Sequence, residues 1–167
     1  GRHAEAEELL ADVMDFDDGH LTPEDGEVLK ILGRCRLSQG RCEEAADAFC
    51  RARRVYEDTG SMRSVEYAEV LVLQGAVCLE RREADEAVEH FEQAQEVLEV
   101  IGADSHAEYL MLPMHLGRVD LARGDTAAAL ELFGRARGAM EGAGFVETPE
   151  YGRLLLATGR CLLVGGG

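Results

Sequence analysis

Side chains that usually catalyse reactions or bind metals are scattered through this sequence rather than gathered into a motif. The five cysteines contain no Cys-x-x-Cys pair, and no histidine stands at a zinc-finger distance from a cysteine pair. The G-x-S-x-G, H-E-x-x-H, Walker and Rossmann patterns are absent from the sequence as well. We therefore expect no catalytic residue, no metal site and no cofactor.

Arginine provides the clearest candidate for binding chemistry. Arg34, Arg118 and Arg160 belong to one series of positions spaced by 42 residues, whose remaining member is Ala76. A guanidinium group makes two parallel hydrogen bonds to a carboxylate or phosphate, so this series is a candidate anion site. Two interpretations are open: the arginines bind an acidic ligand, or they form ion pairs with acids of a neighbouring helix.

The overall charge limits the kinds of partner. Asp and Glu number 33 against 17 Lys and Arg, and the formal net charge of −16 leaves no general basic footprint for nucleic acid or an anionic membrane. No apolar run reaches the roughly 18 to 20 residues that span a bilayer, so we expect a cytoplasmic protein. The strong preference for Arg over Lys is typical of GC-rich bacterial genomes. A first residue Gly and three final glycines indicate a piece of a longer protein.

The elements that must position the arginines form an internal repeat with a period of 42 residues. Columns of identical residues recur at this spacing over most of the chain. They are Gly33, Gly75, Gly117 and Gly159; Ala45, Ala87 and Ala129; Phe49, Phe91 and Phe133; Ala52, Ala94 and Ala136; and Gly60, Gly102 and Gly144. A composition that is 46% hydrophobic but only 5% aromatic favours stacked helices built on Leu, Ala and Val.

Each repeat carries the signals of two helices. Thr22 followed by Pro23 is a helix start, with a hydroxyl cap and a proline in the first turn, and Thr148 with Pro149 repeats it. The first helix of each unit is expected to end near Gly40, Arg82 or Gly124, and the second at Gly60, Gly102 or Gly144. Small residues on the second helix allow it to approach the first closely.

The first repeat contains the pattern L-G-x6-G-x3-E-A-x3-F-x2-A between Leu32 and Ala52. This pattern resembles the tetratricopeptide repeat (TPR), and a 42-residue unit with acid–tyrosine pairs such as Glu66 and Tyr67 is similar to the longer subtype of kinesin light chains. The resemblance implies an all-α, right-handed solenoid of eight helices. The expected organisation is a lone second-type helix over residues 3–19, full repeats over 20–60, 61–102 and 103–144, and a lone first-type helix over 145–167.

In this family the concave wall formed by the first helices binds peptides, which implies a non-catalytic protein-interaction module. Counted from the repeating glycine, the resemblance places nine candidate partner-binding residues on that wall. They are Lys30, Arg34, Val72, Ala76, Met111, Met114, Arg118, Arg153 and Arg160. The expected ligand is an acidic or C-terminal-carboxylate peptide, with the chain's own acids mainly on the convex and terminal surfaces.

Two other functions are open at this point. The array could regulate or inhibit a catalytic domain of a larger bacterial signalling protein or effector, or it could be a structural oligomerisation unit. Residues 154–164 contain five leucine or valine residues besides Leu154 in a first helix that lacks its own second helix. An uncovered apolar face of this kind predicts self-association through residues 154–164.

Overall fold

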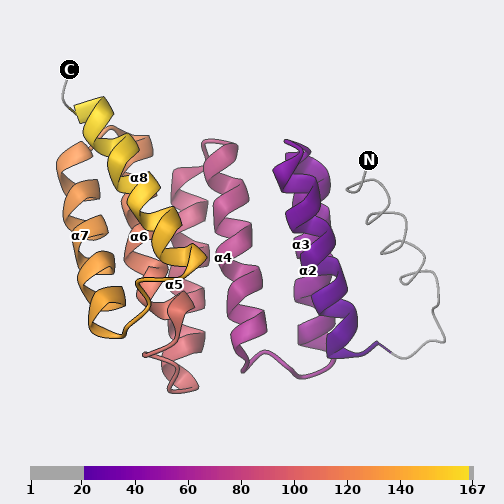
Figure 1. The fold of residues 1–167 in the computed structure, drawn as a ribbon. Helices are drawn as coiled ribbons and strands as arrows, with labels where there is room; N and C mark the ends of the chain where they lie inside the picture. The colour runs from indigo at the N-terminus through magenta and orange to yellow at the C-terminus, as the bar shows by residue number, and fades with distance from the viewer. Residues whose placement is uncertain (1–20, 166–167) are drawn as a thin grey trace.

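A computed structural model describes residues 21–165, and all of its regular elements are α-helices (Figure 1). The seven helices are α2 (Pro23–Ser38), α3 (Cys42–Asp58), α4 (Val65–Glu80), α5 (Ala84–Val100), α6 (Ala107–Arg123), α7 (Thr126–Gly142) and α8 (Pro149–Gly165). The helix expected over residues 3–19 lies outside the described residues. The described part is therefore an all-α solenoid of seven helices.

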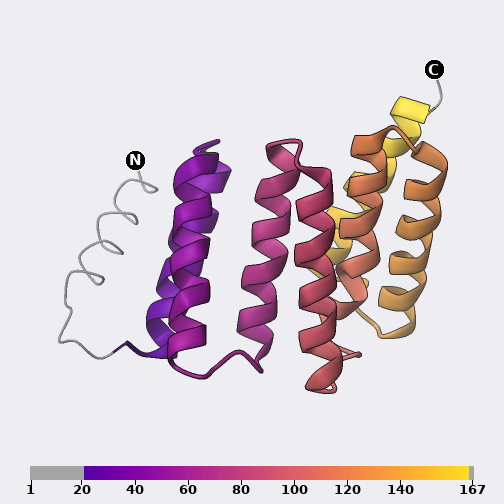
Figure 2. The ribbon, with the colours of Figure 1, turned by 180° about the vertical axis from the view of Figure 1, so that it is seen from behind.

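The helices stack as antiparallel pairs in two layers (Figures 1 and 2). We call α2, α4, α6 and α8 the A helices, and α3, α5 and α7 the B helices. Each A helix packs on the next A helix along the stack, whereas in the described residues no B helix contacts another B helix. The A layer is thus the more tightly spaced, inner side of the stack, and the face built from it is the concave face.

Hydrogen bonds hold the first turns of three A helices, two of which begin at the predicted residues Thr22 and Thr148. The Thr22 backbone N–H donates to the Asp25 carboxylate (2.7 Å), and the Ser64 hydroxyl accepts from the backbone N–H of Tyr67 (3.1 Å). The hydroxyl of Thr148 accepts in the same way from the backbone N–H of Tyr151 (3.3 Å). These caps fix where α2, α4 and α8 begin and therefore how far along each helix axis the following residues lie.

The turns use the left-handed backbone conformation that the glycines predict. The φ angles are positive at Gly40, Gly60, Gly102, Gly124 and Gly144, between 69° and 87°. Arg82 takes the same conformation with φ of 65°, the one non-glycine residue to do so in the described range. Arginine therefore occupies a glycine position at the turn between α4 and α5.

The repeating columns form the interface within each helix pair. The alanines and phenylalanines of these columns are buried, and each phenylalanine ring lies directly over the repeating glycine of its A helix. A Cβ atom on Gly33, Gly75 or Gly117 would lie 2.4, 2.5 or 2.7 Å from the ring of Phe49, Phe91 or Phe133. The glycine is thus required by the close approach of the two helices.

A second repeating contact joins neighbouring pairs. A tyrosine near the start of an A helix donates its hydroxyl proton to a glutamate ten residues earlier, on the preceding B helix. The bonds run from Tyr67 to Glu57 (3.1 Å), from Tyr109 to Glu99 (3.1 Å) and from Tyr151 to Glu141 (2.7 Å). The three bonds set the position of each unit on the one before it.

None of the helices between residues 21 and 165 is both long enough and apolar enough to cross a membrane.

Candidate functional site

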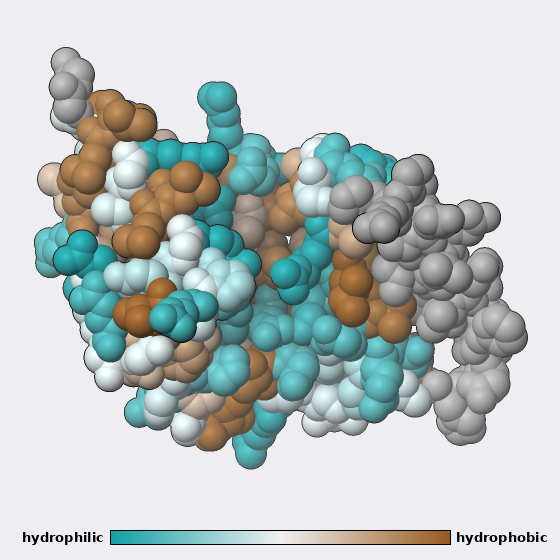
Figure 3. All heavy atoms as spheres, in the orientation of Figure 1, coloured by the Kyte–Doolittle hydropathy of each residue, from teal (hydrophilic) through white to brown (hydrophobic). Residues whose placement is uncertain are grey.

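The concave face contains a cavity of about 420 Å³ between the A helices. Its walls come from all four A helices, from Arg34 on α2 to Arg160 on α8. Figure 3 shows this side of the molecule hollowed near its centre, with hydrophilic residues around the hollow. We call this cavity the groove.

The groove gathers seven of the nine residues that the resemblance placed on the concave wall. They are Arg34, Val72, Ala76, Met114, Arg118, Arg153 and Arg160. Val72, Met114 and Leu156 give it an apolar floor, and Leu73, Ala76 and Ala157 add small or aliphatic surface. The groove therefore combines an apolar centre with charged side chains.

The remaining two predicted residues, Lys30 and Met111, do not line the groove. Lys30 is only 3% exposed, and its ammonium group lies 2.7 Å from Glu27 and also donates to Glu69. Burial acts to lower the pKa of Lys30, but the bonds to the two carboxylates outweigh it and raise that pKa above its ordinary value. Met111 is 2% exposed and belongs to the apolar core together with Phe133 and Leu154.

The three arginines of the series stand at one end of the groove. Each is the twelfth residue of its A helix, so the three side chains start at the same distance from the beginning of their helices. Arg118 lies 3.4 Å from the carboxylate of Glu80, whereas Arg34 and Arg160 are exposed and form no ion pair with any described residue. Burial lowers the pKa of Arg118, and the nearby positive charge of Arg160 adds to the effect. Of the two interpretations of these arginines, an ion pair with an acid of a neighbouring helix therefore applies to Arg118 alone.

Acidic residues line the other end, and none of them is among the nine candidate residues. Glu69, Glu108 and Glu150 all face the groove, although the acids were expected mainly on the outer surfaces. Burial raises the pKa of Glu108, and the negative charges of Glu69 and Glu150 act in the same direction. The available signal was the recurrence of glutamate at 108 and 150, the second residue of α6 and of α8.

His115 lies between the two charged ends and carries no charge. Burial, together with the positive charges of Arg118 and Arg153, lowers its pKa to about 3. Its ring packs 5.2 Å from the ring of Phe91, and its Nδ1 atom is buried without a hydrogen-bond partner in the described structure. His115 therefore supplies apolar surface to the groove rather than a titrating group.

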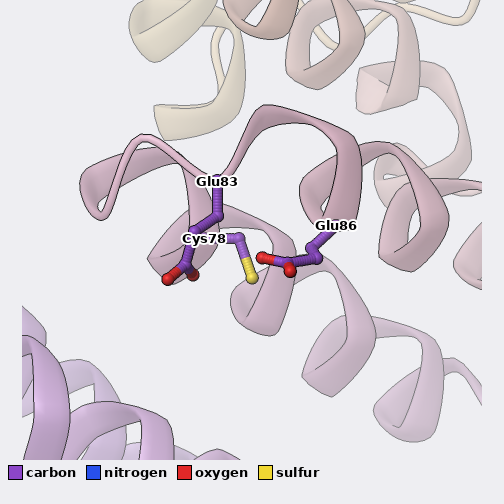
Figure 4. Close-up of side chains that lie close together, drawn as sticks. All are labelled: Cys78, Glu83 and Glu86. Atoms are coloured by element: carbon purple, nitrogen blue, oxygen red, sulfur yellow. The ribbon is translucent and has the colours of Figure 1, made fainter.

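A cluster with metal-ligand chemistry occurs at the turn between α4 and α5 (Figure 4). The ligand atoms of Cys78, Glu83 and Glu86 lie within 4.8 Å of one another. Burial raises the pKa of the Cys78 thiol, as do the two carboxylates, which favours the protonated form that does not bind metals. Glu83 also lies 4.0 Å from Arg81, so we assign no ion to this cluster.

Comparisons with known proteins agree with this architecture. Two family models, each described as tetratricopeptide repeat, match residues 1–60 and 66–142. No curated protein matches the chain in sequence.

Solved structures show the same fold. BtubC (BKLC) from P. vanneervenii superposes with a TM-score of 0.78 at 16% identity, over 99% of this chain and 67% of that one. Two crystal structures of a putative kinesin light chain of Podosopora anserina with nearly identical TPR-like repeats give TM-scores of 0.72 and 0.69. Both match at 20% identity over 99% of this chain and 80% of theirs. Helix pairs, repeat columns and family models lead to one conclusion: the chain belongs to the tetratricopeptide repeat family.

Proposed function

We propose that the chain is a non-catalytic protein-interaction module that binds an acidic peptide segment of a partner in the groove. The observation that carries the proposal is the gathering of seven predicted residues around one cavity, where the guanidinium groups of Arg34 and Arg160 pair with no acid between residues 21 and 165. The family favours the same role, because TPR arrays present surfaces to protein partners. The cytoplasmic location and the bacterial origin of this protein stay predictions from the sequence.

The groove suits a short segment with an acidic residue and apolar neighbours. Exposed arginines bind a carboxylate bidentately, and the exposed side chain of Leu156 offers apolar surface beside them, above the buried side chains of Val72 and Met114. Ala76 interrupts the arginine series, so the charged contacts are discontinuous. Because the whole chain carries a charge of −16, the arginines act locally, and binding should weaken as salt screens them.

The test is binding of a fluorescent peptide with one aspartate and apolar neighbours, measured by polarisation. Arg160→Gln should weaken binding by about tenfold, the usual effect of losing one charged hydrogen bond. Arg137→Gln on α7 is the matched control, because Arg137 is exposed, pairs with Glu141 and does not line the groove. Equal binding to wild type and Arg160→Gln would contradict the proposal.

Self-association through residues 154–164 is a second candidate function. Leu155, Leu156, Leu162, Leu163 and Val164 are all at least 46% exposed. Gly159 is the repeating glycine of α8, and no described atom lies within 4 Å of the Cβ it would carry, so the notch that holds a phenylalanine in the other pairs is open. Burying a few hundred Å² of this face at about 25 cal/mol per Å² would favour a dimer.

Light scattering over a concentration series tests the self-association. We expect the mass to rise with concentration for the wild type and to stay at one chain for Leu163→Glu, whose side chain is 83% exposed. A wild type that stays monomeric at high concentration would contradict it. A regulatory array within a larger signalling protein also remains a prediction of the family resemblance.

A further inference from the structure

The groove has two oppositely charged ends at a fixed separation. Glu108 is the second residue of α6 and Arg118 is the twelfth; Glu150 and Arg160 hold the same places on α8. Ten residues of α-helix rise about 15 Å, so carboxylates and guanidinium groups face the same groove about 15 Å apart along the helix axes. The apolar floor of Val72 and Met114 lies between these ends.

Charges are not balanced at either end. Of the described residues that line the glutamate end, Arg153 is the one cation against the three carboxylates of Glu69, Glu108 and Glu150, and the buried Lys30 pairs with Glu69. At the arginine end, Arg34, Arg118 and Arg160 line the groove with no groove-lining acid beside them, and only Arg118 pairs with an acid, Glu80, among the described residues. The glutamate end therefore attracts a cation, and the arginine end attracts an anion.

Glu108 is the carboxylate at which a cation would bind. Lys30 already donates to Glu69, and Arg153 lies 2.9 Å from Glu150. The Glu108 side chain makes no hydrogen bond or ion pair with any described residue, although it is partly buried in the groove wall. A partly buried carboxylate that accepts no hydrogen bond is unfavourable, and the nearby charge of Arg153 does not outweigh the burial, so a bound ammonium or guanidinium group would relieve that cost.

We propose that the groove selects a segment carrying both charges: a lysine or arginine bound at Glu108, and an acidic residue bound at Arg118 and Arg160. The inference rests on the proposed function and adds a cation subsite to it. An extended chain advances about 3.3 Å per residue, and side chains four residues apart point to the same side. Charges at positions i and i+4 therefore span about 13 Å, which matches the two ends once side-chain reach is included.

This geometry disfavours peptides of a single charge. A segment acidic at both positions would place one carboxylate against Glu69, Glu108 and Glu150, and a segment basic at both would place a cation against the arginines. Selection thus comes from repulsion at one end as much as from attraction at the other.

The experiment compares two blocked peptides, Lys-x3-Asp and Ala-x3-Asp, with identical uncharged spacers. Polarisation titrations against the wild type should show the lysine peptide binding about tenfold more tightly. Glu108→Gln, which keeps the shape of the side chain, should abolish this advantage, so that the two peptides bind the variant equally well. Glu131→Gln, an exposed position on α7 outside the groove, should retain the advantage.

Two outcomes would overturn the cation subsite: equal binding of both peptides to the wild type, or a lysine advantage that survives Glu108→Gln. If Ala-x3-Asp still binds in a manner that depends on Arg160, the proposed function stands while the cation subsite fails. If neither peptide binds at micromolar to millimolar concentrations, both proposals fail. Thermal unfolding of each variant, followed by circular dichroism, confirms that the fold is intact.

Discussion

Single residues at repeating positions determine how closely the two helices of a pair can approach. Gly75 lies under the ring of Phe91, whereas Gly159 holds the same repeat position with no described atom near its Cβ site. The same substitution therefore has opposite consequences at the two sites. The pair provides a matched test of the packing account.

Gly75→Ala should lower the free energy of unfolding by about 1–3 kcal/mol, the cost of forcing an extra carbon into a packed interface. Gly159→Ala should leave it unchanged or raise it by up to about 1 kcal/mol, because alanine favours the helix more than glycine. Urea unfolding of both variants measures the difference. Equal effects at the two sites would contradict the close approach seen at Gly75.

Arg82 is the residue whose backbone conformation does not suit its side chain. It adopts a φ of 65°, which glycine adopts at the equivalent turn positions, Gly40 and Gly124. Because the left-handed conformation costs other residues about 1–2 kcal/mol, Arg82→Gly should raise the free energy of unfolding by about 1 kcal/mol. A melting temperature lower than that of the wild type would show that the Arg82 side chain contributes more than its backbone costs.

At the scale of the elements, hydrogen bonds from tyrosine to glutamate connect each pair of helices to the next. Burial raises the pKa of Tyr67, with its bond to Glu57 adding to the shift. The pKa values of Tyr109 and Tyr151 are raised mainly by their bonds to Glu99 and Glu141. These connections therefore depend on tyrosines that keep their protons.

The raised tyrosine pKa values predict a loss of stability in alkali. The hydrogen bonds of Tyr109 and Tyr151 stabilise the folded chain fully below the ordinary tyrosine pKa of 10.0. This stabilisation is lost as the pH rises above that value, because the tyrosines of the unfolded chain lose their phenolic protons at a lower pH than those of the folded chain. The free energy of unfolding should thus fall as the pH rises above about 10. The fall should be smaller in a Tyr109→Phe, Tyr151→Phe double variant, measured by urea unfolding at several pH values. An identical fall in both proteins would exclude Tyr109 and Tyr151 as its cause.

The sequence predicts the helix pairs more completely than it predicts the residues that line the groove. Identical residues at a fixed period reveal the helix pairs, because close packing demands glycine and phenylalanine at the same places in every unit. The arginine end follows from the same period. Lys30 and Met111 share their repeat positions with groove residues, but neither lines the groove. Lys30 is held in an ion pair with Glu69, and Met111 is enclosed in the apolar core around Phe133. Which side chains turn inward depends on neighbouring helices that the period alone does not describe.

The molecule as a whole is acidic, but one end of its groove is basic. A net charge of −16 resides on 167 residues, yet three arginines converge on the concave face. Stacking causes this local reversal of sign, because it brings residues 42 positions apart in the sequence to the same height on adjacent helices. The function proposed for the molecule depends on that convergence.

Mapping of amide chemical shifts by NMR, with the aspartate peptide as ligand, shows where on the solenoid the peptide binds. We expect perturbations concentrated on the groove residues of α4, α6 and α8, including Val72, Met114, Arg118 and Arg160. We also expect Arg160→Gln to reduce them at equal peptide concentration. Perturbations concentrated on the B helices α3, α5 and α7, with the groove residues unchanged, would contradict binding in the groove.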